Sequence, residues 1–379
     1  MKISDSLDVM ISKTLFVIFG MYNNKVLVSP QHQQGRNTNI EILRFVLMCF
    51  IFFWHILVHG YNLKMLGTDS YQYNGNFGLT GLLLTLFVPA TYCFVFISGY
   101  YGIRFKVSRL INLLLWCIIV SLSAKCYDIY QGGSSNVVDF LESMLPITSN
   151  KWWFMTDYVM LYILSPILNE GFDHLSKKSK VYLLGLLFIF SVIGIVVLYQ
   201  NQGSNLVGLI MVYLLARLLH GEIWGGKFTM RNSIKIYATS FILLFSCISA
   251  IYYGADLIHL TSAKKMIFPL LSYANPLNIL MAVTLFYIVK NIPQYSNSFL
   301  NKILSANLFI YLITEIGGFV SYKDIAKLFD RSFGLAMLYS FGIIIACLGI
   351  GYLIMMLVSM IVKKVLNIVK NNINVEYFR

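Results

Sequence analysis

The chain has 379 residues, of which 58% are hydrophobic, 15% are aromatic and only 12% are charged. Apolar runs of about twenty residues recur along it, which excludes an ordinary water-soluble globular protein and predicts an all-α, polytopic transmembrane helical bundle. We assign the formal net charge of +13 to loops that face anionic lipid, so no nucleic-acid partner is expected.

Residues 1–36 are predicted to form an N-terminal extension that precedes the membrane domain. The stretch 7–22 is apolar but carries Asp8 and Lys13, as an interfacial amphipathic helix would. A cleaved signal peptide is disfavoured because Asp5 and Asp8 are among the first charged residues and no small-residue cleavage site follows. We predict a transmembrane domain over 37–362 and a basic cytoplasmic tail over 363–379.

The first predicted span, 39–60, is long and apolar enough to cross a bilayer, yet it carries Glu41, Arg44, His55 and His59. Titratable groups are costly in hydrocarbon, so a span that keeps them indicates a functional site. Arg44 and His55 share one helix face and lie about 16 Å apart along the axis, at about 1.5 Å per residue. The alternative is that Arg44 snorkels to lipid head groups while His55 is a hydrogen-bonded packing residue.

Metal binding is the other chemistry that this span suggests. His55 and His59 are four positions apart, a spacing at which two histidines can share an ion. No cysteine or carboxylate cluster completes the ligand set in the sequence, so we predict no metal. The six cysteines are irregularly spaced in or beside apolar runs, which is typical of small core residues rather than of a disulfide framework.

Nine further apolar stretches are predicted to cross the membrane, which gives about ten spans. They lie near 78–102, 108–126, 152–168, 181–198, 206–219, 236–253, 268–289, 303–320 and 333–362. Lys and Arg are concentrated in alternate connecting segments, so the positive-inside rule predicts that both termini are cytoplasmic. Arg44 then lies near the cytoplasmic side, and His55 reaches toward the outer half.

Four segments in this order resemble a known family. In the first span, Arg44 and His55 are separated by ten residues. The second span ends with PATYCFVFISGYYG and leads into the basic turn IRFKVSRL. The fourth span contains WWFMTDYVMLYILSPILN, and the ninth contains SANLFIYLITE. Over about 37–362, this arrangement resembles acyltransferase family 3, the bacterial membrane-bound O-acyltransferases. The family often has a histidine where this chain has Thr314, which is followed here by Glu315.

The resemblance implies an O-acetyltransferase of the bacterial inner membrane. Such an enzyme moves an acyl group, usually acetyl from acetyl-CoA, to a sugar hydroxyl of a cell-surface polysaccharide or of its lipid-linked precursor. His55 is the candidate base for the hydroxyl proton, and a transient acyl-imidazole is the alternative. Arg44 would hold the donor or stabilise the oxyanion. Glu315 would take the role of the missing histidine or orient His55.

Three basic residues are candidates for binding the donor. Arg104, Lys106 and Arg109 lie in the short turn before the third span, where basic side chains and free amides suit the phosphates of coenzyme A. An ordinary positive-inside loop would also carry them. Acetyl-CoA is thus expected as a cosubstrate, with no resident cofactor.

Three residues are candidates for binding the acceptor. Asp157 is an intramembrane carboxylate, Trp153 could stack on a sugar ring, and Asn278 follows Pro276 and could line a cavity. Local pairing for Asp157 and an interfacial aromatic belt for Trp153 are the structural alternatives.

A lipid-linked oligosaccharide flippase or polysaccharide exporter is the competing function. It would share the many spans, the basic loops and the buried charges. The pair of Arg44 and His55 on one face, together with the basic turn, favours the enzyme because transport requires neither. The absence of a repeat between the two halves also weakens a transporter. The expected partners are acyl-CoA, a glycan or glycolipid acceptor, and membrane lipid.

Overall fold

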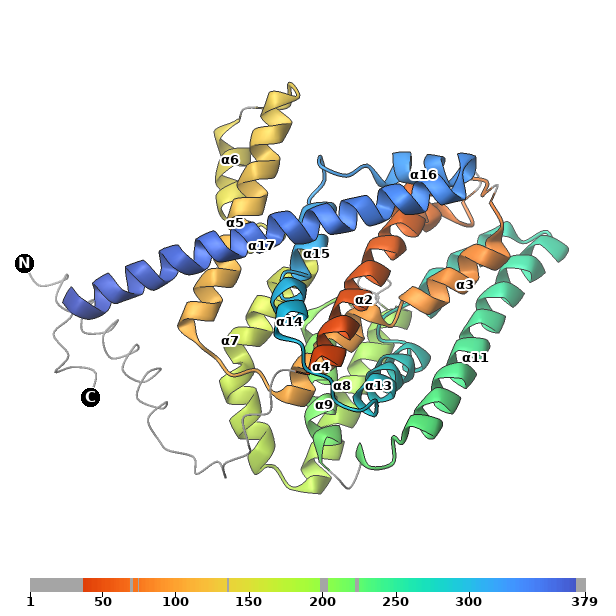
Figure 1. The fold of residues 1–379 in the computed structure, drawn as a ribbon. Helices are drawn as coiled ribbons and strands as arrows, with labels where there is room; N and C mark the ends of the chain where they lie inside the picture. The colour runs from red at the N-terminus through yellow and green to blue at the C-terminus, as the bar shows by residue number, and fades with distance from the viewer. Residues whose placement is uncertain are drawn as a thin grey trace, which may run out of the picture. The chain divides into compact units, whose positions relative to one another are not determined.

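The computed structural model describes residues 37–372 apart from 69–70, 74, 135, 198–203 and 222–224. Every regular element in this part of the chain is a helix, which confirms the all-α prediction (Figure 1). The predicted interfacial helix at 7–22 and the end of the predicted tail, 373–379, lie outside the described residues.

In chain order, the α-helices are α2 (Thr38–His55), α3 (Phe77–Phe87), α4 (Ala90–Tyr101), α5 (Val107–Tyr130), α6 (Val137–Met144), α7 (Trp153–His174), α8 (Lys177–Val197), α9 (Leu206–His220), α11 (Met230–Leu257), α12 (Ile267–Leu270), α13 (Pro276–Lys290), α14 (Ser298–Leu304), α15 (Leu308–Glu315), α16 (Tyr322–Arg331) and α17 (Phe333–Asn372). A π-helical turn, η1 (Ile56–Gly60), continues α2, and two short 3₁₀ helices are η2 (Leu63–Met65) and η3 (Thr261–Met266).

Five helical segments are long and apolar enough to cross a membrane. They are Thr38–Gly60, Phe77–Tyr101, Val107–Tyr130, Met230–Leu257 and Phe333–Val365, while α9 and α13 are apolar but shorter. The predicted count of about ten spans is not confirmed. Two of the predicted spans are broken, the eighth into α12 and α13 and the ninth into α14 and α15. A helix as short as α15 covers about 12 Å of a hydrocarbon core that is about 30 Å thick.

The first span begins and ends with distinct local structures. The side chain of Asn37 caps α2 by accepting a hydrogen bond from the amide of Asn39 at 3.0 Å. After His55 the helix widens into η1, and π-helical turns of this kind often occur at functional sites. Such a turn re-aims the side chains that follow it, so His55 and His59 lie where the helical spacing changes.

Gly60, at the end of η1, allows α16 to pack closely. A Cβ atom placed there would lie 2.6 Å from the carbonyl oxygen of Tyr322 and 2.9 Å from the Cβ of Ala326. Both neighbours belong to α16, whose residues Ile325 and Ala326 are buried against this part of the fold. The absence of a side chain at Gly60 therefore sets how near α16 comes to the end of the first span.

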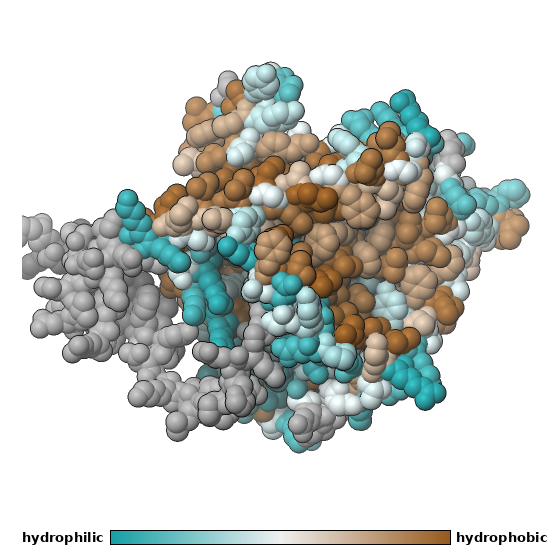
Figure 2. Space-filling view, viewed as in Figure 1, coloured by the Kyte–Doolittle hydropathy of each residue, from teal (hydrophilic) through white to brown (hydrophobic). Residues whose placement is uncertain are grey.

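The buried core lies where α2, α4, α9, α13 and α15 pack together. Its largest fully buried side chains include Trp152, Tyr92, Tyr213 and Tyr287. By contrast, α5, α11 and α17 bury only a small share of their apolar residues within the protein. Apolar side chains cover the middle of the face shown in Figure 2, as expected for surface that contacts lipid.

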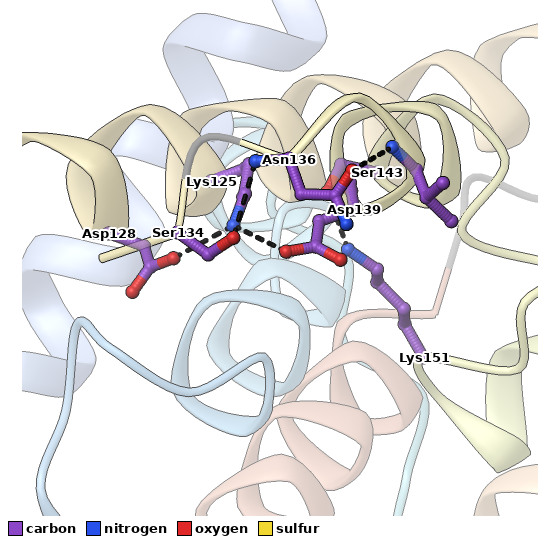
Figure 3. A network of polar contacts seen from close by, with 8 residues as sticks. Lys125, Asp128, Ser134, Asn136, Asp139, Ser143 and Lys151 are labelled. Carbon is purple, nitrogen blue, oxygen red and sulfur yellow. Dashed lines mark hydrogen bonds and ion pairs between the residues drawn. The ribbon is translucent and has the colours of Figure 1, made fainter.

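A polar network ties α6 to α5 (Figure 3). Lys125 Nζ lies 3.0 Å from Asp128 Oδ2 and 3.5 Å from Asp139 Oδ2, and Lys151 Nζ donates to Ser143 Oγ at 2.7 Å. Lys151 comes two residues before α7 begins at Trp153. The network therefore helps to fix the entry of α7, which carries Trp153 into the pocket described next.

Candidate active site

His55 and Glu315 form the centre of the site. Each is the last residue of its helix, α2 and α15 respectively, and their side chains meet with His55 Nδ1 2.7 Å from Glu315 Oε2. The contact joins a ring nitrogen to a carboxylate oxygen and becomes an ion pair when the imidazole is protonated. The side chains are 9% and 22% exposed, so the pair is largely shielded but reachable. The structure thus brings together two of the three residues predicted to be catalytic.

Tyr322 supports the carboxylate from the start of α16. Its hydroxyl donates to Glu315 Oε2 at 3.1 Å, and its ring lies 5.8 Å from the ring of His55, centre to centre. Burial, and then the charge of Glu315, raises the pKa of Tyr322 well above its ordinary value. The phenol therefore stays protonated as a donor. The sequence alone does not reveal Tyr322, because nothing in the order of the chain places α16 beside α2.

A pocket of about 210 Å³ opens on one side of this pair. It is lined by His55, His59, Glu315, Trp153, Tyr273 and Lys64, among others. Trp153 stacks on Tyr273 with ring centres 5.7 Å apart and an interplanar angle of 27°. Trp153 therefore belongs to the wall of the pocket at His55, and an aromatic wall is the kind of surface on which a sugar ring can stack.

A much smaller space also borders His55, toward the start of α2. Its volume is about 10 Å³, and its lining includes Met48, Ile51, Thr91 and Tyr311. The Tyr311 hydroxyl is buried beside the Phe154 backbone amide, its proton has no acceptor among the described residues, and its ring lies 6.3 Å from that of His55. A buried donor without an acceptor beside the candidate base is costly unless a ligand uses it. Its position four residues before Glu315 on one helix was the available sequence signal.

Arg44 is held apart from His55. Its Nη1 donates to Glu41 Oε1 at 2.9 Å, the pairing that a three-residue spacing in a helix allows. Neither of the two pockets that His55 lines includes Arg44. Met48 and Ile51 lie between them along α2. The two residues share a helix, as predicted, but not an open cavity.

The basic turn is well placed for contact with solvent. The side chains of Arg104, Lys106 and Arg109 are exposed, and no ion pair or hydrogen bond of theirs occurs among the described residues. The backbone of the turn is fixed, because the Tyr162 hydroxyl accepts from the Lys106 amide at 3.0 Å. Asn169 Nδ2 also donates to the Ile103 carbonyl at 3.0 Å. A rigid turn that presents three free cations suits an anionic ligand.

Two of the predicted acceptor residues lie away from His55. Asp157 is half-buried on α7 and lines neither of the pockets at His55. Asn278 is buried, and its Nδ2 donates to the carbonyl of Ser272 at 2.5 Å. That bond shapes the turn before α13, next to Tyr273. Asn278 thus supports the pocket wall without lining the pocket.

A carboxylate also completes the histidine pair of the first span. One ligand atom from each of His55, His59 and Glu315 lies within 4.8 Å of the others. No carboxylate lies near these histidines along the sequence, but the fold brings Glu315 to them, as expected for a residue that orients His55. Glu315 comes from α15, and its approach depends on the tertiary fold rather than on spacing along the chain.

Comparison with known protein families identifies the family to which this helical protein belongs. A family model described as an acyltransferase domain matches residues 37–363. No curated protein and no solved structure matches the chain. The match covers the whole membrane domain and all the residues of the site. The chain therefore belongs to acyltransferase family 3.

Proposed function

We propose that the protein is a membrane O-acyltransferase that carries an acetyl group from acetyl-CoA to a sugar hydroxyl of a cell-surface polysaccharide or of its lipid-linked precursor. Family membership supports acyl transfer. The single observation that carries the finer proposal is the shielded contact of His55 with Glu315 at the edge of a pocket with an aromatic wall.

Proton transfer is the role proposed for His55. Glu315 faces Nδ1 and orients the ring, which leaves Nε2 to accept the proton of the acceptor hydroxyl. The oxygen attacks the thioester carbonyl, and the tetrahedral intermediate then expels the thiolate, which takes the proton back from the imidazolium. In the variant mechanism His55 carries the acyl group, and a second step delivers it to the hydroxyl.

Tyr311 is proposed to stabilise the oxyanion of the intermediate. Its hydroxyl is buried, its proton has no acceptor among the described residues, and Tyr311 lines the narrow space that His55 also lines. A preorganised donor in a water-poor site stabilises developing negative charge strongly. This assignment gives the hydroxyl proton an acceptor during the reaction.

The donor is proposed to enter from the cytoplasm. Arg104, Lys106 and Arg109 would hold the phosphates of the donor, and Arg44 would contact the pantetheine as it passes toward His55. The alternation of Lys and Arg along the sequence supports an inner-membrane protein with both termini in the cytoplasm. The acceptor would use the larger of the two pockets at His55, with its sugar against Trp153.

The decisive test is turnover of acetyl-CoA by the purified protein in detergent with a lipid-linked glycan acceptor. His55→Ala is expected to lower the rate by about 10²- to 10⁴-fold, the usual contribution of a positioned base. His174→Ala is the matched control, because His174 also pairs with a glutamate, Glu170, but is 79% exposed on α7. The proposal fails if the wild type neither binds nor hydrolyses acetyl-CoA while it moves glycolipid across liposomes. That outcome would establish a flippase.

A further inference from the structure

The group formed by His55, His59 and Glu315 has the composition of a metal site. Two imidazoles and one carboxylate are a common ligand set for Zn²⁺, with a fourth position left for water or another ligand. The three ligand atoms already lie within 4.8 Å of one another. The pocket of about 210 Å³ beside them leaves room for that fourth ligand and a path for the ion.

The three side chains are held in place by different parts of the fold. His55 ends α2, His59 belongs to η1, and Glu315 ends α15. Tyr322 donates to Glu315 Oε2, and its ring stacks on that of His59 at 6.1 Å with an interplanar angle of 23°. A neighbour that orients a ligand in this way is characteristic of metal centres.

Small movements are enough to close the ligands on an ion. Zinc bonds to nitrogen and oxygen are about 2.0–2.2 Å long, which places tetrahedral ligand atoms about 3.3 Å apart. The contact of 2.7 Å between His55 and Glu315 would open slightly, and the widest separation in the group would shorten. Lys64 lines the same pocket, and its positive charge would weaken the binding of a cation there.

We propose that His55, His59 and Glu315 bind Zn²⁺ and that the bound ion switches off acyl transfer. The inhibitory part rests on the proposed function of His55 as a base. A neutral imidazole has one protonated nitrogen and one free nitrogen. Zinc bound to Nδ1, the nitrogen that faces Glu315, requires the proton to sit on Nε2. The proposed base needs the other tautomer, in which Nε2 is unprotonated. Zinc binding and proton acceptance by His55 therefore exclude each other.

The binding test uses the full chain, purified in detergent, treated with chelator and titrated with Zn²⁺ against a chromophoric zinc indicator. One ion per chain is expected to bind. His59→Ala should weaken binding by more than about 10-fold, since changes to groups that merely orient a ligand cost about 10- to 100-fold. His174→Ala removes the exposed histidine that pairs with Glu170, and it should leave zinc binding unchanged. Thermal unfolding of each variant shows whether it is folded.

The same samples separate zinc binding from the proposed activity. Each variant's acyl-transfer rate with zinc is divided by its own rate without zinc, so any basal effect of the substitution cancels. Wild type should be inhibited, and His59→Ala should be inhibited only at more than about tenfold higher zinc. Equal zinc affinity in wild type and folded His59→Ala, or activation by zinc, overturns the proposal. Zinc binding by a wild type that never transfers acyl groups would instead overturn the proposed function and leave the ion site standing.

Discussion

At the scale of single residues, the site depends on the polar groups that surround His55. Glu315 is its acidic neighbour at 2.7 Å, Tyr322 holds that carboxylate, and Tyr311 adds a hydroxyl whose proton has no acceptor among the described residues. Burial makes each of these interactions stronger than it would be in water, and makes the loss of one costly. Replacing a single oxygen atom should therefore have a measurable effect.

Tyr322→Phe removes only the hydroxyl that donates to Glu315. A hydrogen bond to a charged group contributes about 1.5–3 kcal/mol, so a rate loss of roughly 10- to 100-fold is expected if the bond orients the carboxylate during the reaction. The measurement is kcat for acetyl transfer beside the melting temperature. A variant that melts earlier but turns over normally would show that Tyr322 serves stability alone.

Tyr311→Phe tests the proposed oxyanion donor. The hydroxyl proton has no acceptor among the described residues in the ground state, and the oxygen faces only the Phe154 amide, so the folded protein should be nearly as stable. The kcat should fall by about 10²- to 10³-fold with KM little changed, as for the loss of other oxyanion donors. Unchanged kcat would remove Tyr311 from the mechanism.

At the scale of elements, the end of the first span is defined by its contact with α16. The π-helical turn η1 and α16 pack closely because Gly60 has no side chain. Tyr322 and His59 both depend on this contact for their positions. The geometry of the candidate site therefore depends on this one contact between η1 and α16.

Gly60→Ala should push α16 away from η1. The new Cβ would meet backbone at 2.6 Å, and backbone cannot rotate aside as a flexible side chain can. We expect a lower melting temperature together with lower activity. Gly254→Ala on α11 is the matched control, because no atom lies within 4 Å of its added Cβ and alanine favours helix. Equal melting temperatures for the two variants would contradict the packing argument.

The sequence predicted the elements better than it predicted their contacts. The first span, with Arg44 and His55, was predictable because a long apolar run in a membrane protein has one stable form. The sequence did not predict the breaks between α12 and α13 and between α14 and α15, because neighbouring helices can bury a turn inside a bundle. The approach of Glu315 to His55 depends on such a break. Trp153, predicted as belt or platform, lies in the pocket wall because α7 begins there.

At the scale of the whole molecule, exposure has two meanings, since lipid covers some surfaces and water covers others. Cys126 is exposed at the end of α5, beside the charged network of Lys125 and Asp128. Cys247 is exposed in the middle of α11, a candidate membrane span. Both thiols are exposed on the protein surface, but only a thiol in contact with water forms the reactive thiolate.

Variants that retain one cysteine should distinguish these surfaces. Cys126 should react in intact cells with a membrane-impermeant maleimide, because the predicted topology places the end of α5 outside. Cys247 should stay unlabelled, since a thiol in hydrocarbon does not form the reactive thiolate. Labelling of Cys126 only after the cells are permeabilised would reverse the predicted topology. Cys117, buried nearer the middle of α5, is the negative control.

The narrow space beside His55 has a consequence for the cell's energy supply. A histidine connected by continuous water to both faces of an energised membrane would let protons leak and dissipate the gradient. Met48 and Ile51 line a volume of only about 10 Å³ there, enough for about one water molecule. A space this small holds no continuous column of water, so the resting protein should be a barrier to protons. Passage of the donor's thin thioester arm would then be the event that opens it, so that acylation need not discharge the membrane.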